Sequence, residues 1–448
     1  MDLKRVGIND GLAVAMDPLN ALVELERFGI QPGLNTIRNL TAALGEPQTA
    51  YQSIIVAGSN GKGSVVAMID RALRAAGYRV GRYTSPHLTT LAERFVVDGD
   101  QITEPELRAE AEQLQHQVTR LVTDGHLSQP PTFFEATTAI ALSWFQRTGV
   151  ELALLEVGLG GRFDATNIVT PVAGVITPIA LEHCQYLGDT IEAIALEKIG
   201  IVKSGMVVVT TEMNPAVVEL FDQACRQTGA RLVQANQGTI VENIPTENTG
   251  TIQVTTPTRT YPPFKMSLPG AHQISNGIGA IRLLEELADL GIPVGVDAVV
   301  SGLSTVVWPG RLERLQISGR GTVLLDAAHN PAAAAALASY LREAFPNGLP
   351  LVFSALNDKD IPAVVEQLAP SATQIICTAP DNQRTVPAHT LAEQVRQAAG
   401  SKHVTAYEEP QRALEAAWRQ SQTVCATGSI VLIGELLTLL RQLSPSRS

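Results

Sequence analysis

Short, continuous apolar runs alternate with segments of helical spacing in the first part of the chain. An apolar run at 53–57 precedes a helical pattern at 65–76, and a helical pattern at 134–147 precedes apolar runs at 152–155 and 172–176. Continuous apolar runs of this length are typical of strands buried on both faces, as in a parallel sheet covered by helices. The pattern therefore predicts an α/β fold whose first sheet is mainly parallel.

A different pattern occupies residues 230–268. At 251–255 apolar and polar residues alternate, which is typical of a half-exposed antiparallel strand. We expect a small antiparallel addition to the first unit here. A helical pattern at 274–290 follows, and a break that contains Pro and Gly lies at 308–310.

After this break the alternation of strands and helices begins again. Strands are predicted at 322–325, 351–354, 375–377 and 430–433, and a helix is predicted at 331–344. These elements indicate a second, smaller α/β unit. A chain of 448 residues is also too long for one ordinary core, which favours two domains.

The composition is that of a globular protein, with 45% hydrophobic and 17% charged residues. The formal net charge of −11 argues against nucleic acid as a partner, because phosphate backbones are bound by basic surfaces. The four cysteines form no CxxC pair, so neither a zinc site nor a disulfide framework is expected. Residues 1–5 do not resemble the start of a signal peptide, and no apolar run reaches the roughly 18 residues of a membrane span. We therefore expect a cytoplasmic protein with no membrane partner.

A glycine-rich turn with a lysine lies between the first predicted strand and its helix. It reads Gly58-Ser-Asn-Gly-Lys-Gly-Ser64. Successive backbone N–H groups in such a turn, together with the start of a helix, attract a phosphate group. The lysine would reach the terminal phosphates of a nucleotide, and the last hydroxyl would bind Mg²⁺. The residues expected at this phosphate site are Gly58, Asn60, Gly61, Lys62, Gly63 and Ser64.

The loop departs from the standard Walker A pattern. Val56 stands where a Walker A loop has glycine, and Gly63 separates Lys62 from Ser64. A kinase or GTPase loop is therefore a poor match. The alternative of a tight turn without a ligand leaves the lysine unexplained. The loop is similar instead to the G-T-N-G-K-G-S loop of the Mur ligase superfamily.

Further motifs follow this loop in a fixed order. They are Thr84-Ser-Pro-His-Leu88, Glu156-Val-Gly-Leu-Gly-Gly-Arg-Phe-Asp-Ala-Thr-Asn167, Glu197-Lys-Ile-Gly-Ile-Val-Lys203, Pro269-Gly-Ala-His272 with Asn276, Trp308-Pro-Gly-Arg-Leu-Glu313, Asp326-Ala-Ala-His-Asn-Pro331 and Asn357-Asp-Lys-Asp360. In number, order and spacing they resemble the motifs of the folylpolyglutamate synthase/dihydrofolate synthase family, a branch of the Mur ligases. This resemblance implies a P-loop-type domain with a mainly parallel sheet at 1–305, a linker at 306–311, and a smaller Rossmann-like α/β domain at 312–440.

The resemblance also implies ATP and Mg²⁺ as cofactors, with two magnesium sites. Glu156 ends a buried strand beside a glycine-rich turn, where α/β proteins place ligands, and a carboxylate suits a hard divalent cation. A capping glutamate is the structural alternative. By the resemblance, Ser64, Ser85, Glu156 and His183 hold magnesium. The family usually has Asp-His where this chain has Glu182-His183, and the extra methylene changes how the histidine is presented.

Lys198 lies in a helical segment and, by itself, reads as an ordinary solvated lysine. In the family the matching lysine is often carbamylated, which turns a cation into a carboxylate-like metal ligand. The resemblance therefore implies a carbamylated Lys198 beside magnesium.

In the second unit, Asp326 and His329 lie between a strand and a helix opened by Asn330-Pro331. The resemblance assigns Asp326 to the region of the nucleotide ribose, Arg311 to the phosphates and Asn276 to the adenine. It places His329 near the reacting groups. A purely structural loop is the alternative reading of this motif.

Two aromatic residues and a carboxylate open a predicted helix in the first unit. Phe133 and Phe134 would stack on a flat pterin, with Glu135 beside them. Packing in the core is an equally good explanation of each ring.

The function implied by the resemblance is an ATP-dependent ligase that joins L-glutamate to dihydropteroate and to reduced folates through an acyl phosphate. Lys62, Lys198, Asp326 and His329 would be its catalytic residues, and the family suggests a monomer. A ligase with only one of the two activities, a Mur-type ligase with another acceptor, and a nucleotide-binding switch without catalysis are the alternatives. Only 57 residues precede Gly58, too few for the extra nucleotide-sugar domain of cell-wall Mur ligases. The second-unit motifs argue against a simple switch.

Overall fold

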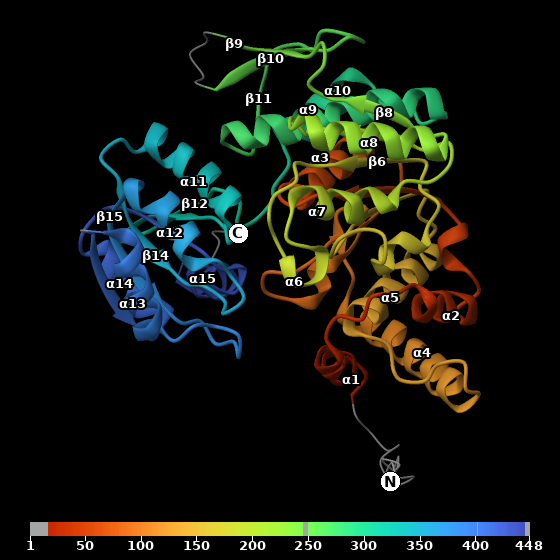
Figure 1. Cartoon of the computed structure of the whole chain (residues 1–448), viewed down its shortest axis with the longest axis horizontal. Helices are drawn as coiled ribbons and strands as arrows, with labels where there is room; N and C mark the ends of the chain where they lie inside the picture. Colours follow the sequence, from red (N-terminus) through yellow and green to blue (C-terminus); the bar gives the residue numbers. More distant parts are fainter. Residues whose placement is uncertain (1–16, 245–249, 401, 444–448) are drawn as a thin grey trace.

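The computed structural model describes residues 17–244, 250–400 and 402–443. It contains two α/β units, each built on its own sheet. In Figure 1 the second unit, coloured cyan to blue, lies to the left of the first. Within the described residues no helix is both long enough and apolar enough to cross a membrane.

The sheet of the first unit has eight strands among the described residues, in the order β4-β3-β2-β5-β1-β6-β7-β8. All neighbours from β2 to β8 pair in parallel, and only β3 and β4 run antiparallel at one edge. This confirms the mainly parallel sheet predicted from the apolar runs. The strands are β1 (Gln52–Ala57), β2 (Val80–Tyr83), β3 (Phe95–Val97), β4 (Asp100–Gln101), β5 (Leu152–Glu156), β6 (Ala173–Ile176), β7 (Val207–Thr210) and β8 (Arg231–Gln234).

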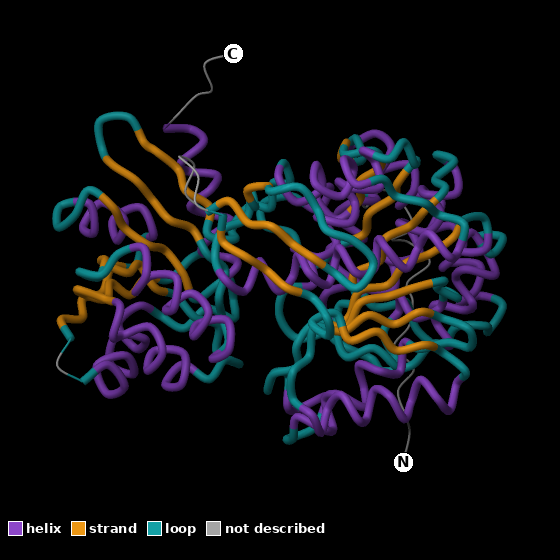
Figure 2. Tube along the Cα trace, turned by 90° about the horizontal axis from the view of Figure 1, so that it is seen from above, coloured by secondary structure: helices purple, strands orange, loops and turns teal. Residues whose placement is uncertain are grey.

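Helices cover both faces of this sheet, as Figure 2 shows for the strands of the first unit. One face packs against α3 (Lys62–Ala75), α9 (Ala271–Glu286) and α10 (Val296–Ser304). The other face packs against a larger group: α1 (Pro18–Glu24), α2 (Asn35–Ala43), α4 (Glu104–Thr123), α5 (Phe133–Arg147), α7 (Ile191–Lys198) and α8 (Pro215–Thr228). The short α6 (Cys184–Leu187) follows β6. Because both faces are buried, the strands are continuously apolar.

A second, small sheet stands apart from the large one at the top of Figure 1. It is antiparallel, in the order β11-β10-β9, with β9 (Ile240–Asn243), β10 (Thr251–Thr255) and β11 (Phe264–Lys265). The antiparallel strand expected at 251–255 is therefore present. The segment predicted to begin this addition at 230 instead contains β8, which pairs in parallel with β7 in the large sheet.

The second unit has a six-stranded sheet in the described residues, in the order β12-β13-β17-β14-β15-β16, parallel except for the edge strand β12. Its strands are β12 (Glu313–Ile317), β13 (Gly321–Leu325), β14 (Leu349–Phe353), β15 (Ala372–Thr378), β16 (His403–Tyr407) and β17 (Thr423–Thr427). On one face lie α11 (Pro331–Ala344), α12 (Ile361–Leu368) and α13 (Ala388–Ala399); on the other lie α14 (Pro410–Trp418) and α15 (Ile430–Leu443).

The strand predicted at 430–433 is wrong. These residues form the first turn of α15, and the last strand of the sheet is β17 instead. A run of four apolar residues fits a buried helix as well as a buried strand, and here Leu432 and Ile433 are fully buried on the helix side. Single-turn 3₁₀ helices complete the fold: η1 (Leu25–Phe28), η2 (Pro47–Thr49), η3 (Leu91–Arg94), η4 (Ala165–Ile168), η5 (Ile199–Ile201), η6 (Leu287–Leu290) and η7 (Ala369–Ser371).

Candidate active site

The glycine-rich loop joins the end of β1 to the start of α3, as predicted. Gly58 and Gly61 both adopt positive φ, of 131° and 90°. A Cβ at Gly58 would overlap the hydroxyl of Thr177, so only glycine fits there. Lys62 folds back over the loop, and its Nζ donates hydrogen bonds to the carbonyl oxygens of Gly58 at 3.0 Å and Ser59 at 3.2 Å. The loop thus holds an ammonium group at the positive end of a helix.

Two side chains from α9 contact the phosphate loop. Gln273 donates from Nε2 to the Oγ of Ser64 at 3.2 Å, and its Oε1 accepts from Asn276 Nδ2 at 3.0 Å. The Asn276 amide lies so close to Gly61 that a Cβ there would overlap it. Ser64 is therefore oriented by a side chain more than 200 residues away in sequence.

The segment between the two units also touches the loop. A Cβ at Gly63 would lie 2.8 Å from the indole ring of Trp308. The guanidinium of Arg82 also lies over the Trp308 ring, with 5.1 Å between Cζ and the ring centroid. Arg82 is held in turn by the buried Asp70 at 3.1 Å. The linker residue Trp308 is thereby fixed against the phosphate loop.

The carboxylate of Glu156 is buried at the end of β5 and accepts a hydrogen bond from the backbone N–H of Ser85 at 3.3 Å. Burial raises the pKa of the Glu156 carboxyl above its usual value, although the positive charge of Lys62 opposes this. Ser64 and Ser85 line the same cavity as this carboxylate, and carboxylate and hydroxyl oxygens are ligands that Mg²⁺ prefers. Within the described residues no three His, Cys, Asp or Glu side chains cluster tightly enough to form a metal cage by themselves.

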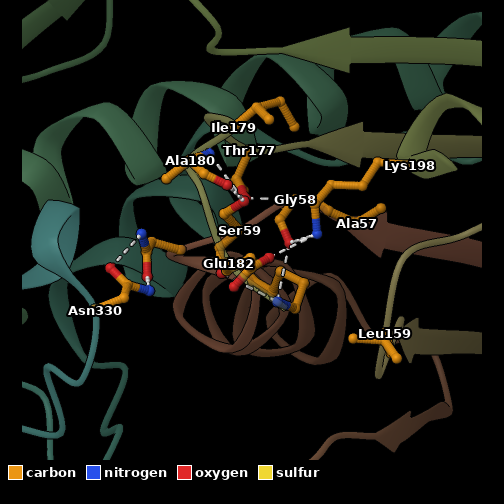
Figure 3. A network of polar contacts seen from close by, with 12 residues as sticks. Ala57, Gly58, Ser59, Leu159, Thr177, Ile179, Ala180, Glu182, Lys198 and Asn330 are labelled. Carbon is orange, nitrogen blue, oxygen red and sulfur yellow. Dashed lines mark hydrogen bonds and ion pairs between the residues drawn. The ribbon is translucent and has the colours of Figure 1, made fainter. Parts of the chain in front are cut away.

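Behind the loop, Lys198 forms a buried ion pair with Glu182 (Figure 3). The Lys198 Nζ lies 2.8 Å from Glu182 Oε1 and also donates to the Gly58 carbonyl oxygen at 2.9 Å. Burial lowers the pKa of the Lys198 ammonium to about 8, although Glu182 acts in the opposite direction. Burial works to raise the pKa of Glu182, but the charges of Lys198 and Lys62 outweigh it and lower that pKa to about 2. Both groups are therefore charged at neutral pH.

Across the cavity, the second unit contributes Asp326 and His329. The Asp326 carboxylate accepts hydrogen bonds from the backbone N–H groups of Leu312 and Ala328, both at 3.0 Å. Burial raises the pKa of Asp326, and the charge of Arg311 opposes this. Burial, with some help from the charge of Lys359, lowers the pKa of His329 to about 4. The His329 imidazole is thus neutral at pH 7.

The start of α5 carries the predicted aromatic pair. Phe134 packs on the backbone of Gly158, where a Cβ would come within 2.6 Å of the ring, and its ring centroid lies 5.9 Å from that of Tyr83. Glu135 takes part in a capping box, in which its Oε2 accepts from the backbone N–H and the hydroxyl of Thr132, each at 2.8 Å. One oxygen of the Glu135 carboxylate thus already has a structural role.

The phosphate loop, Glu156, the start of α5 and the segment with Asp326 and His329 line one cavity of about 940 Å³ between the two units. Of the residues predicted from the sequence, those on its wall are Asn60, Gly61, Lys62, Gly63, Ser64, Ser85, Phe133, Phe134, Glu135, Glu156, His183, Asn276, Arg311, Asp326 and His329. Gly58 and Lys198 lie behind the wall, and Lys198 is 2% exposed.

Comparison with known proteins gives two family matches. The Mur ligase middle domain matches residues 56–284, and the Mur ligase, glutamate ligase domain matches residues 310–433. The dihydrofolate synthase/folylpolyglutamate synthase of Bacillus subtilis is 34% identical over 422 residues, which are 93% of this chain and 96% of that protein.

The chain belongs to the dihydrofolate synthase/folylpolyglutamate synthase family.

Other family members differ in length or are known as structures. A probable bifunctional folylpolyglutamate synthase/dihydropteroate synthase of Haloferax volcanii is 36% identical over 81% of this chain, but the chain spans only 43% of that protein's length. The folylpolyglutamate synthase of Mycobacterium tuberculosis, solved with ADP and AMPPCP, matches with a TM-score of 0.86 at 32% identity over 95% of this chain and 99% of that one. A bifunctional folylpolyglutamate synthase/dihydrofolate synthase solved with Mn, AMPPNP and L-glutamate matches with a TM-score of 0.81 at 26% identity over 95% and 98% of the two chains.

Sequence reasoning missed several residues on the cavity wall of this family member. Gln273 lies one helical turn before Asn276, and that spacing alone would have pointed it toward the same loop. Arg94 belongs to a Glu-Arg pair before a short strand and looks like ordinary surface charge, yet it is buried. Glu182 was noted only as a departure from the family pattern, whereas in the structure it is the partner of Lys198.

Proposed function

We propose that this chain is an ATP-dependent ligase that joins L-glutamate to dihydropteroate and to reduced folates. The observation that supports this most is the cavity itself. It is lined by the phosphate-loop Lys62 and the acid Glu156 of the first unit, and by Arg311, Asp326 and His329 of the second. A nucleotide-binding switch without catalysis would not need Arg311, Asp326 and His329 of the second unit. The relatives of known structure, solved with adenine nucleotides and in one case with L-glutamate, support the same assignment.

The proposed reaction begins with the acceptor carboxylate, which is a poor acyl donor because oxide is a poor leaving group. One of its oxygens attacks the γ-phosphorus of ATP, the bond to the β-phosphate oxygen breaks, and ADP leaves. Lys62 and Arg311 neutralise negative charge on the transferred group. The product is an acyl phosphate, which carries a good leaving group.

The amine of L-glutamate then attacks the acyl carbon and loses a proton as the tetrahedral intermediate collapses to amide and inorganic phosphate. In our proposal His329 accepts this proton or a hydrogen bond from the amine. The side chain is neutral, and its Nδ1 lies 2.9 Å from the Ala327 carbonyl oxygen, so with Nδ1 protonated Nε2 keeps its lone pair. Asp326 is proposed to contact the ribose and Asn276 the adenine.

Divalent metal is proposed at Glu156, with oxygen ligands from Ser64 and Ser85, and a second ion near His183. When bound, Mg²⁺ would neutralise charge on the phosphates. The donor set fits, because the Glu156 carboxylate is buried and shares its cavity wall with Ser64 and Ser85.

A carbamylated Lys198 is a further part of the proposal. Only the unprotonated amine adds CO₂, and a pKa of about 8 leaves roughly a tenth of Lys198 unprotonated at pH 7. The carbamate would lie against the Glu182 carboxylate, and two adjacent anions need a cation between them. We therefore expect carbamylation only together with the second metal ion.

The experiment follows phosphate release by the purified protein with MgATP and L-glutamate, with dihydropteroate in one reaction and tetrahydrofolate in another. The mass of each product is measured, and Lys62→Ala serves as the blank. Amide products from both acceptors would establish the bifunctional enzyme, and a product from one alone would restrict the proposal to that activity. No amide product from either would refute the folate assignment and point to a Mur-type acceptor.

We also propose that the enzyme works as a monomer in the cytoplasm. Residues 306–311 would be the hinge between domains 1–305 and 312–440, because they connect α10 of the first unit to β12 of the second. Closure about this hinge would exclude water from the acyl phosphate.

A further inference from the structure

Arg94 is a buried cation on the wall of the catalytic cavity. It ends η3, directly before β3, and is only 7% exposed. Its backbone carbonyl accepts a hydrogen bond from Thr84 N at 3.2 Å, which ties it to the loop that carries Ser85. The position of Arg94 is therefore fixed relative to the proposed metal site at Glu156 and Ser85.

The contacts of the Arg94 side chain are all uncharged. Its Nε donates to Nδ1 of His87 at 3.0 Å, and its Cζ lies 5.1 Å from the centroid of the Phe133 ring. Because Nδ1 of His87 accepts this hydrogen bond, it carries no proton and the imidazole is neutral. The neighbouring acid Glu93 instead accepts hydrogen bonds from backbone N–H groups, such as that of Leu88 at 2.7 Å.

In the described part of the chain, the other buried arginine, Arg282, and the largely covered Arg82 both have carboxylate partners. Arg82 lies 3.1 Å from Asp70, and Arg282 pairs with Glu285. Among the described residues, no carboxylate lies within ion-pair distance of Arg94, and the hydrogen bond from its side chain comes from Nε, not from the two terminal nitrogens. The charge of Arg94 acts at longer range on the Glu156 carboxyl, whose pKa it helps to lower. A buried guanidinium without a directly hydrogen-bonded anion is costly, so an arginine in this state is prepared for an anion that arrives with a ligand.

We propose that Arg94 binds the carboxylate of the acceptor, the group that becomes activated. This rests on the proposed function. A guanidinium whose Nε is already fixed presents its two terminal nitrogens as a fork, which matches a carboxylate with two parallel hydrogen bonds. Arg94 lies between two parts of the cavity that the acceptor would occupy. Its guanidinium lies over the Phe133 ring, and its backbone carbonyl is hydrogen-bonded to the loop that carries Ser85. The acceptor carboxylate has to lie between an aromatic pocket and the metal-bound phosphates.

Phosphate is the other anion that the same fork would accept. We favour the carboxylate because Lys62 lies at the phosphate loop, whereas Arg94 lies on the aromatic ring expected to contact the acceptor. The difference is measurable, since the acceptor and the nucleotide are separate ligands.

The test compares the affinity for dihydropteroate with that for its neutral carboxamide, by equilibrium fluorescence at saturating AMPPNP and Mg²⁺. We expect the wild type to prefer the acid and Arg94→Met to lose about 10- to 100-fold in affinity for the acid while binding the amide unchanged. Arg94→Lys keeps the charge but not the fork, and it should fall between the two. Arg384→Met removes another arginine of the cavity wall, one paired with Asp358 at 2.7 Å, and should bind the acid as the wild type does.

Several results would overturn the proposal. An equal loss of affinity for acid and amide in Arg94→Met would mean that Arg94 only supports the pocket. Weaker AMPPNP binding with unchanged acceptor binding would identify phosphate as the anion. Binding of neither acid nor amide by the wild type would remove the folate function itself, and the proposal with it. Thermal unfolding of each variant separates these results from misfolding, and Arg94→Lys carries the test if Arg94→Met does not fold.

Discussion

Asn60 of the phosphate loop and Asn330 at the start of α11 exchange two side-chain hydrogen bonds across the boundary between the units (the dashed lines at Asn330 in Figure 3). Asn330 Nδ2 donates to Asn60 Oδ1 at 2.8 Å, and Asn60 Nδ2 donates to Asn330 Oδ1 at 3.2 Å. The Asn330 oxygen also accepts from the backbone N–H of Ala333 at 2.9 Å, which fixes the orientation of the amide. Because His329 is the preceding residue, this pair sets its position relative to the phosphate loop.

The first prediction concerns this amide pair. Serine caps a helix about as well as asparagine but is too short to reach across the boundary. Asn330→Ser should therefore keep α11 and lower kcat about tenfold, with little change in nucleotide affinity, because two neutral hydrogen bonds that hold the units in register are lost. Steady-state kinetics and AMPPNP binding measure the two effects.

The matched control for this prediction is Asn60→Ala, alone and combined with Asn330→Ser. If the two side chains act as a pair, the double variant should be no slower than the slower single variant. Effects on kcat that multiply in the double variant would contradict the pairing. A fall in nucleotide affinity that accounts for the whole loss in Asn330→Ser would contradict the positioning role.

The second prediction concerns the packing of α15 against the first unit. A Cβ at Gly434 would overlap the backbone carbonyl of Leu88, and the Leu88 side chain packs into the core of the second unit. Gly434→Ala should push α15 away from the loop that carries Ser85 and destabilise the protein by about 3 kcal/mol. It should also lower kcat. Urea unfolding and steady-state kinetics check both.

Gly295→Ala is the control for this substitution. Gly295 has an ordinary negative φ of −69°, and nothing lies within 4 Å of the position its Cβ would occupy. Gly295 is the N-cap of α10, where alanine is a poorer cap, so this variant should lose at most about 1 kcal/mol and keep the wild-type rate. A Gly434→Ala protein as stable and as active as the wild type would mean that the two units do not pack at Leu88 in solution.

Local chemistry explains which parts of the fold and site could be predicted from the sequence. The phosphate loop and the helix predicted at 331–344 were predictable because glycine, lysine and proline determine structure over a few residues. The strand predicted at 430–433 failed because a four-residue apolar run has no periodicity to distinguish strand from helix.

The partners that act on the site could not be predicted in this way. Asn60 and Asn330 are 270 residues apart, and Gln273 and Ser64 are 209 apart, so only the assembled sheets bring them together. The burial of Arg94 depends likewise on α5 packing over it. Residue types and motifs predicted the groups that are proposed to do chemistry, but not the groups that orient them.

The third prediction concerns Glu156. Glu156→Gln keeps the shape of the side chain but removes the charge that a divalent cation needs, so turnover should fall roughly 100-fold or more. Burial raises the pKa of Glu156, which means that the ionised form destabilises the metal-free protein. The variant without metal should therefore be at least as stable as the wild type at pH 7. Mn²⁺ titration followed by electron paramagnetic resonance and thermal unfolding measure the two effects.

Glu110→Gln is the matched control for Glu156→Gln. Glu110 is also buried, but it pairs with Arg147 at 2.7 Å. Its loss should lower stability and leave Mn²⁺ binding unchanged. Unchanged Mn²⁺ binding in Glu156→Gln would remove Glu156 from the metal site.

The fourth prediction concerns the Lys198–Glu182 ion pair and its dependence on pH. Lys198 has a pKa of about 8 in the folded protein and 10.5 as its ordinary value, so the unfolded chain binds more protons between these values and the stability rises with pH there. Glu182 has a pKa of about 2 against an ordinary 4.5, so its contribution is present above pH 4.5 and is lost as the pH falls toward 2.

Glu182→Gln leaves the buried ammonium without its carboxylate, so we expect a loss of about 3 kcal/mol in the free energy of unfolding at pH 7. It should also lower the pKa of Lys198 further, which lets the lysine become neutral closer to pH 7. The difference from the wild type should therefore shrink between pH 7 and pH 9.5, because both proteins then carry mostly neutral Lys198. Urea unfolding at the two pH values measures this. Glu182→Asp, which keeps the charge, should lose less stability at pH 7 than Glu182→Gln, and a deficit of equal size at both pH values would show that the carboxylate acts through packing instead of charge.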